Sequence, residues 1–313
     1  MQTLQNIKKE IKKAIIGHEN LINSMLIALI SNGHILIEGV PGIAKTTAIK
    51  ALANAINLNF KRVQFTPDLL PSDITGVEIY NPKTNEFQTK KGPIFTNFLL
   101  ADEINRAPAK VQSALLEAMQ ERQVTIGEEN FSLPNPFMVL ATQNPIEQEG
   151  TYPLPEAQLD RFMLKVEVGY NSIEEEIKII KLLENPKEIK PVANKEDILI
   201  LQKEVKKIHI DEELIRYIAE IVNETRYPKK IKYGEYIELG ASPRATISLV
   251  TASKANAMLK NKDYVAPSDI IELIPLVIKH RIKLNYKAEA DEINKDMIIK
   301  EIIKVIDIPW ESL

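Results

Sequence analysis

The distribution of apolar residues changes along the chain and predicts two parts. Up to about residue 170, short apolar runs alternate with amphipathic helical stretches, a pattern typical of a parallel sheet covered by helices. From about residue 195 onward the apolar positions recur at helical spacing, for example at Leu214, Ile218 and Ile221. The pattern predicts an α/β domain over residues 1–190 and a smaller, all-helical domain over residues 191–313.

Several local signals place the elements. Predicted strands are Ile35–Ile37, Phe60–Phe65, Phe98–Ala101, Phe137–Thr142 and Met163–Val168. Predicted helices in the first part are residues 1–15, a stretch from about Glu19, and Thr46–Ile56. Two insertions have the pattern of β-hairpins, with turns over Asn81–Asn85 and Gly127–Asn130. Ser172 with Glu175 has the spacing of a helix capping box, and Ser242-Pro243 and Pro267-Ser268 each predict a helix start.

A glycine-containing turn connects the first predicted strand to the next helix. Glycine lets the backbone curl so that successive N–H groups point at a phosphate, and the helix N-terminus adds partial positive charge. The Lys45 ammonium can reach the outer phosphates, and the Thr46 hydroxyl can bind Mg²⁺. The general pattern has glycine before the lysine, whereas this chain has Ala44. The candidate nucleotide-binding residues are Gly39, Val40, Pro41, Gly42, Ile43, Ala44, Lys45, Thr46 and Thr47.

Two later predicted strands also end in polar residues. Asp102 and Glu103 follow the strand Phe98–Ala101. Asp102 is the expected partner of Mg²⁺, directly or through water, and Glu103 the expected base for the attacking water. Asn144 follows another strand and can contact the γ-phosphate or that water, although it also precedes a proline and is a common turn residue. Together with the phosphate loop, these residues predict an ATPase that uses ATP and Mg²⁺.

Composition narrows the alternatives. Lys and Arg total 40 against 43 Asp and Glu, so no bulk positive charge is available to hold nucleic acid. The chain has no cysteine, which excludes disulfides and thiolate metal sites. The polar, lysine-rich N-terminus is unlike a signal peptide, and no apolar stretch is long enough to cross a bilayer. We therefore expect a cytoplasmic protein without a membrane span.

With these motifs in order, almost the whole chain resembles the MoxR family of AAA+ ATPases. The matching segments are Glu38–Thr46, Phe65–Asp73, Ala101–Pro108, Ser113–Met119, Ala141–Pro145, Leu154–Phe162 and Gly240–Ala245. The family's phosphate loop resembles this one, Ala44 included. The resemblance implies a P-loop αβα core with hairpin insertions, a helical lid, assembly as a homo-hexamer, and chaperone-like work on client proteins. It also implies a possible partner with a von Willebrand A domain.

The resemblance also implies roles for single residues. Asn144 resembles the sensor-1 residue, Arg161 the arginine finger that reaches the neighbouring subunit's γ-phosphate, and Arg244 the sensor-2 arginine. For both arginines a surface ion pair is the alternative. The segment at Gly17 resembles the one that packs near adenine, with a simple helix-breaking glycine as the alternative. Whether Arg244 serves its own subunit or its neighbour stays open.

A second group of residues has weaker signals. Gln64 can pair with Glu103 and restrain it until a client engages, and Arg106 can face a subunit interface. The hairpins resemble insertions that line the central pore, which makes Tyr80 and Phe87 candidate client contacts, with local packing as the alternative. We expect His34, His209 and His280 to be packing or surface residues.

The leading hypothesis is a protein-remodelling ATPase. The alternative is a nucleic-acid-remodelling AAA+ motor of the MCM or clamp-loader kind, for which a basic stripe is expected. The only tight basic clusters are Lys90-Lys91 and the segment 229–232, which more often are solvated faces. A small-molecule P-loop kinase would lack an arginine finger, and an inactive scaffold would not need Glu103.

Overall fold

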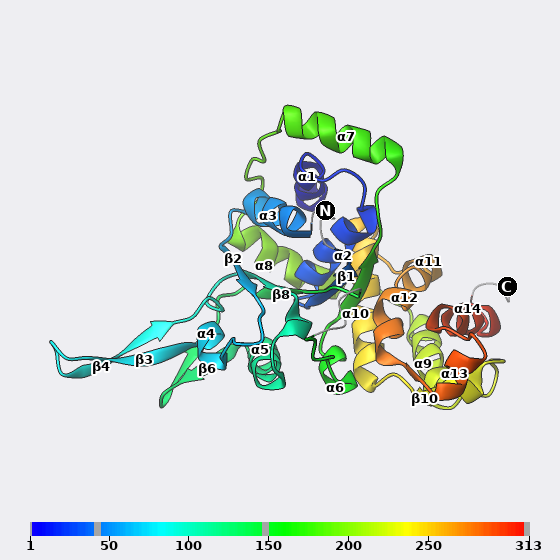
Figure 1. The fold of residues 1–313 in the computed structure, drawn as a ribbon. Helices are drawn as coiled ribbons and strands as arrows, with labels where there is room; N and C mark the ends of the chain where they lie inside the picture. The colour runs from blue at the N-terminus through cyan, green and yellow to red at the C-terminus, as the bar shows by residue number, and fades with distance from the viewer. Residues whose placement is uncertain (1, 41–44, 146–149, 310–313) are drawn as a thin grey trace. The chain divides into compact units, whose positions relative to one another are not determined.

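A computed structural model describes residues 2–40, 45–145 and 150–309 (Figure 1). The chain divides into two compact units. The sheet unit comprises Gln2–Leu154 and Val166–Ile200, and the helical unit comprises Pro155–Lys165 and the chain from Leu201 onward. Within the described residues, no helix is both long and apolar enough to cross a membrane.

A five-stranded sheet forms the centre of the sheet unit, in the order β2-β5-β8-β1-β9. The strands are β1 (Ile35–Gly39), β2 (Phe60–Gln64), β5 (Phe98–Asp102), β8 (Met138–Gln143) and β9 (Leu164–Val168). β1, β5 and β8 are almost fully buried, which explains their continuous apolar runs. Parallel pairing joins β2 to β5, β5 to β8 and β8 to β1, so all four strands end at one edge of the sheet. The predicted parallel α/β sheet is confirmed.

Helices accompany this sheet (Figure 1). They are α1 (Gln2–Ile11), α2 (Glu19–Ile30), α3 (Lys45–Ile56), α4 (Pro71–Thr75), α5 (Ala109–Glu121) and α7 (Ile173–Glu184), with a 3-10 turn at Ile104–Arg106; α8 (Lys195–Glu204) crosses from one unit into the other. The predicted capping box begins α7, since the Ser172 hydroxyl accepts from the Glu175 N–H and the Glu175 carboxylate from the Ser172 N–H.

Two antiparallel hairpins extend from the sheet unit, as predicted (Figure 1). The first joins β3 (Gly76–Asn81) to β4 (Glu86–Lys91), and the second joins β6 (Gln123–Ile126) to β7 (Glu129–Ser132). The predicted second turn, Gly127–Asn130, was too long, because Glu129 and Asn130 already pair with β6. Gly127 has φ +61°, and this left-handed conformation permits the tighter turn.

His34 joins the sheet to α5 from a buried position. Its Nδ1 accepts from the Val139 N–H at 3.0 Å, and its Nε2 donates to the Met119 carbonyl at 3.1 Å. These two bonds require the neutral ring, and burial lowers the His34 pKa to about 3. The prediction that His34 is a packing residue is confirmed.

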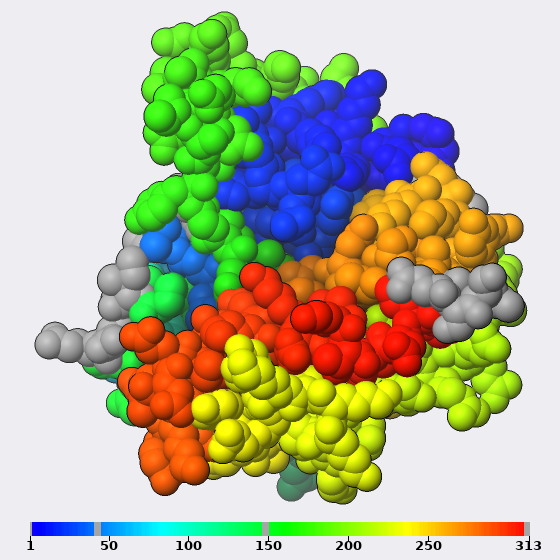
Figure 2. All heavy atoms as spheres, turned by 90° about the vertical axis from the view of Figure 1, so that its right-hand side faces the viewer, coloured from blue at the N-terminus to red at the C-terminus, as the bar shows by residue number. Residues whose placement is uncertain are grey.

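The helical unit consists mainly of short helices, and its segments after residue 225, yellow to red, pack together in the space-filling view (Figure 2). The helices are α6 (Glu156–Leu159), α9 (Glu212–Arg226), α10 (Pro243–Leu259), α11 (Pro267–Ile271), α12 (Ile274–Ile278), α13 (Tyr286–Ala290) and α14 (Lys295–Val305), with 3-10 turns at Val205–Lys207, Gly234–Tyr236 and Lys279–Arg281. Ser242 caps α10 through a bond from the Arg244 N–H, as predicted. A short antiparallel pair, β10 (Ile237–Leu239) and β11 (Lys283–Leu284), was not predicted.

Candidate nucleotide-binding site

Three strand ends bring the predicted chemical groups of the sheet unit together. β8 lies between β1 and β5, and Glu38 pairs with Gln143 while Ala101 pairs with Ala141. The loop after β1, the carboxylates after β5 and the amide after β8 therefore leave the sheet at the same edge. In open α/β sheets, ligands bind outside the carboxyl ends of the strands.

Lys45 opens α3 and is half-buried. Its ammonium donates to the Gly39 carbonyl at 2.6 Å, which folds the side chain back over the end of β1. Burial lowers the Lys45 pKa, whereas Asp102 and Glu103 act in the opposite direction through their negative charges. The lysine and the two carboxylates therefore share one electrostatic environment. Such a site can take up an anion and a divalent cation together.

Asp102 ends β5, and both of its carboxylate oxygens accept hydrogen bonds. Oδ1 accepts from the Thr142 hydroxyl at 2.6 Å, and the same hydroxyl accepts from the Glu103 N–H at 2.8 Å. Oδ2 accepts from the Arg62 guanidinium at 2.6 and 2.9 Å. Thr46 is the second residue of α3, and hydroxyl and carboxylate oxygens of this kind are ligands that Mg²⁺ prefers. The donor set thus fits a magnesium ion.

Glu103 lies just beyond β5 in the left-handed region, with φ +55°. A non-glycine residue there costs free energy, and such strain is concentrated at functional sites. Its Oε2 accepts from Gln64 Nε2 at 2.7 Å and lies 3.2 Å from Arg106 Nε. The expected pairing of Gln64 with Glu103 is therefore present. Arg106, expected at a subunit interface, contacts the same carboxylate.

Asn144 follows β8 and is buried, with 6% of its surface exposed.

The segment at Gly17, which was predicted to pack near the adenine base, lies in another part of the sheet unit. Gly17 has φ +71°, and a Cβ there would lie 2.7 Å from the Glu175 carboxylate and 3.1 Å from the Asn171 side-chain oxygen. The Asn171 oxygen and His18 Nε2 are both buried without a hydrogen-bond partner. Unpaired polar atoms of this kind are consistent with a polar ligand such as a nucleotide base.

The remaining loop residues are only partly described. Val40 follows β1, and Thr47 lies exposed in the first turn of α3. Pro41, Gly42, Ile43 and Ala44 lie outside the described residues.

The helical unit holds the two predicted arginines around Asp160. Arg161 follows Asp160, the residue that caps the C-terminus of α6, and Arg244 lies in the first turn of α10 with its guanidinium 3.8 Å from Asp160. Asp160 also accepts from the Ser242 hydroxyl at 2.8 Å and from Arg281 Nε at 2.8 Å. Asp160, which directly precedes Arg161, is thus bonded both to the start of α10 and to the turn after α12.

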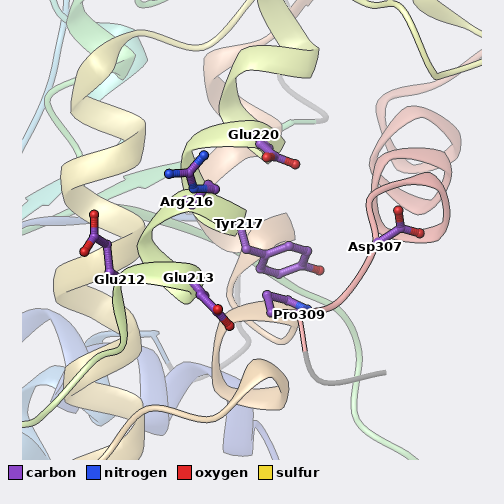
Figure 3. A pocket seen from close by; sticks show the side chains of 7 residues that line it. All are labelled: Glu212, Glu213, Arg216, Tyr217, Glu220, Asp307 and Pro309. Atoms are coloured by element: carbon purple, nitrogen blue, oxygen red, sulfur yellow. The ribbon is translucent and has the colours of Figure 1, made fainter. Parts of the chain in front are cut away.

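A hollow of about 570 Å³ lies in the helical unit (Figure 3). Four carboxylates line it, from Glu212, Glu213, Glu220 and Asp307, together with Arg216. Four negative charges against one positive charge repel a triphosphate, so this hollow is a poor nucleotide site. Among the described residues, no group of three or more His, Asp or Glu side chains forms a metal site.

Sequence reasoning missed Arg62, Thr142 and Asp160. Thr142 and Arg62 each lie 40 residues from Asp102 along the chain and meet it only through strand pairing. Thr142 lies near the end of an apolar strand, and Asp160 precedes the predicted finger arginine; these positions were the available signals.

Comparison with known proteins identifies the class. Residues 34–164 match the ATPase family associated with various cellular activities (AAA), and residues 233–302 match the AAA lid domain. The fold is thus that of an AAA ATPase core followed by its lid.

Relatives define the family within this class. Chaperone MoxR1 of Mycobacterium tuberculosis is 47% identical over 99% of this chain and 83% of that protein. YeaC of Bacillus subtilis is 47% identical over 96% and 93%, and MoxR of Methylorubrum extorquens is 28% identical over 96% and 92%. The chain belongs to the MoxR family of AAA+ ATPases. A crystal structure of a proposed ATPase from Cytophaga hutchinsonii matches with a TM-score of 0.91 and 48% identity over 98% and 95% of the two chains.

Proposed function

We propose that this chain binds ATP with Mg²⁺ at the strand ends of the sheet unit, hydrolyses it, and uses the free energy to remodel a client protein. The observation that carries the proposal is the parallel pairing of β1, β8 and β5, which brings Lys45, folded back over the end of β1, to the same sheet edge as Asp102 and Glu103. This combination supplies a cation for phosphate, an oxygen ligand for a metal and a carboxylate base within one site.

The loop after β1 and the ends of the strands bind different parts of the nucleotide and its metal ion. The Lys45 ammonium exchanges its bond with the Gly39 carbonyl for the outer phosphates. The Thr46 hydroxyl and the Asp102 carboxylate would hold Mg²⁺. The ion would supply positive charge that stabilises the negative charge developing on the phosphates. The segment at Gly17 contacts the adenine base of the nucleotide.

Hydrolysis needs a base and a group that positions the water. Glu103 accepts the proton of the attacking water, and Asn144 orients that water or the γ-phosphate. The bond from Gln64 keeps the Glu103 carboxylate occupied at rest, since Oε2 accepts from its amide at 2.7 Å. Release of this bond when a client engages would couple client binding to hydrolysis.

Arg161 and Arg244 are the proposed arginine finger and sensor-2 arginine. A guanidinium at the γ-phosphate stabilises the charge of the transition state, and a neighbour's arginine makes hydrolysis depend on assembly. We infer a homo-hexameric ring from the family resemblance, in which Arg161 acts on the adjacent subunit.

The first hairpin supplies the client contact in this proposal. Tyr80 and Phe87 pair across β3 and β4 with ring centroids 5.4 Å apart, and 47% and 70% of their surfaces are exposed. Exposed aromatic and apolar residues suit an unfolded polypeptide segment. MoxR1 carries the name chaperone, which supports client remodelling, and a von Willebrand A domain protein is a candidate partner.

The decisive experiment separates binding, hydrolysis and client capture. Lys45→Ala should lose ATP binding, whereas Glu103→Gln should retain ATP and hydrolyse it at least about 10²-fold more slowly. Tagged Glu103→Gln protein held in ATP should then capture client protein, with Lys45→Ala as the matched control. Unchanged ATP affinity in Lys45→Ala contradicts the site, and stimulation of hydrolysis by DNA or RNA alone contradicts the protein client.

A further inference from the structure

Arg62 projects from β2 onto the acidic end of β5. Its Nε and Nη2 donate to the same oxygen of Asp102, Oδ2, at 2.9 and 2.6 Å. The Asp102 side chain is 14% exposed, whereas that of Arg62 is 48% exposed and borders solvent. The guanidinium therefore lies between Oδ2 of the carboxylate and solvent.

The other oxygen of Asp102 offers no free alternative. Oδ1 accepts from the Thr142 hydroxyl, which in turn accepts from the Glu103 N–H, so moving it would disturb the start of the Glu103 turn. Oδ2 is the oxygen that can be released with least rearrangement, because its partner is a long side chain at the surface. A metal ion that uses Asp102, directly or through water, competes with Arg62 for it.

Arg62 also sets the orientation of Gln64. Nη2 of Arg62 donates to Gln64 Oε1 at 2.7 Å, and Gln64 Nε2 donates to Glu103 Oε2 at 2.7 Å. A guanidinium can only donate, so the carbonyl end of the amide must face Arg62 and the NH₂ end must face Glu103. One arginine thereby touches the metal carboxylate and fixes the group that holds the predicted base.

We propose that Arg62 is a positioning residue that holds Asp102 while no metal is bound and releases it when Mg²⁺ is taken up with nucleotide. This inference rests on the proposed function, since it assigns a regulatory contact to the same site. Release of Arg62 removes the donor that orients Gln64, so metal uptake and loosening of Glu103 are linked. Metal uptake thus weakens the restraint on Glu103, which client engagement then releases.

The test measures the Mg²⁺ concentration for half-maximal binding of a fluorescent ATP analogue to the full chain. Arg62→Gln should lower that concentration roughly 2- to 5-fold, which corresponds to the upper part of the range for loss of a partly exposed ion pair. Arg62→Lys retains the charge without the two-bond geometry and should fall between Arg62→Gln and wild type. Lys61→Gln removes a charge from the preceding, exposed position of β2 and should leave the midpoint unchanged.

A double-mutant comparison assigns the effect to Asp102. In an Asp102→Asn background, Arg62→Gln should shift the Mg²⁺ midpoint less than twofold. The inference is overturned if the single variant Arg62→Gln has an unchanged or raised Mg²⁺ midpoint. It is also overturned if Arg62→Gln shifts the midpoint as much in the Asp102→Asn background as in the wild-type background. If Arg62→Gln does not fold, a wild-type midpoint in Arg62→Lys overturns it equally. The proposed function fails separately, through unchanged ATP binding by Lys45→Ala.

Discussion

Replacing Asp160 with alanine should destabilise the helical unit severely. Arg281 is the reason, because its side chain is 1% exposed and Asp160 is its only carboxylate partner within the described residues. The guanidinium otherwise donates to carbonyl oxygens, including those of Met163 and Phe162. Asp160→Ala therefore leaves a buried cation without a counter-charge, and it also removes the acceptor of the Ser242 hydroxyl.

The magnitude follows from the cost of breaking a buried ion pair. Removing one partner of such a pair costs about 3–5 kcal/mol. For a unit of this size, 1 kcal/mol corresponds to a few degrees in Tm, so the transition should fall by roughly 10 °C or more. An exposed ion pair would instead contribute about 0–1 kcal/mol. The burial of Arg281 thus decides which estimate applies.

Thermal unfolding of the full chain, followed by circular dichroism, measures the effect. Asp263→Ala removes a carboxylate from an exposed position of the same unit and should change Tm by less than about 2 °C. The double variant Asp160→Leu/Arg281→Met removes both charges and should recover much of the loss, since apolar replacements of buried pairs are often neutral. A Tm for Asp160→Ala within about 2 °C of wild type would refute the reasoning.

Three further predictions concern the sheet unit and assembly. Gln64→Leu should raise client-free ATP hydrolysis several-fold, because Glu103 loses its bond at 2.7 Å; slower phosphate release would show instead that Gln64 supports catalysis. Arg161→Ala should bind nucleotide but not hydrolyse it. If the arginine acts on the neighbouring subunit, mixing this variant with inactive Lys45→Ala subunits should restore hydrolysis. Mixtures without activity contradict the role of Arg161 as an arginine finger for its neighbour. The His34 pKa of about 3 in the folded protein lies below the pKa of a histidine in the unfolded chain. Acidification from pH 6.5 to 5 therefore protonates His34 mainly in the unfolded state. The free energy of unfolding should fall by about 2 kcal/mol over this range. Urea unfolding measures the free energy of unfolding at each pH, and its dependence on pH should be weaker in His34→Gln. An unchanged dependence assigns the effect to other groups.

The central strands β1, β5 and β8 were predictable because they are buried on both faces. Apolar runs such as Phe98–Asp102 leave little choice between strand and loop, and each is followed by residues that begin a turn. The phosphate loop could also be placed, since its residues are contiguous in sequence. The second hairpin turn was predicted too long because Glu129 and Asn130 have ordinary turn composition, and only strand pairing shows that they belong to β7.

The contacts of the site could not be predicted, because they depend on which strands are neighbours. Side chains at Arg62 and Gln64 share a face of β2 by the two-residue period of a strand, which the sequence does show. Their meeting with Asp102 and Glu103 requires β2 to lie beside β5, a pairing between segments about 40 residues apart.

Register decides the chemistry at this edge of the sheet. Gln64 pairs with Asp102 in the parallel ladder, which places Arg62 on the same face and within reach of the carboxylate. A slip of one residue would turn Lys61 and Val63 toward the site and send Arg62 and Gln64 to the other face. The donors that β2 supplies to both carboxylates would then be lost together. The restraint on Glu103 and the cover on Asp102 are thus consequences of a single strand alignment, and a variant that disturbs one should be examined for loss of the other.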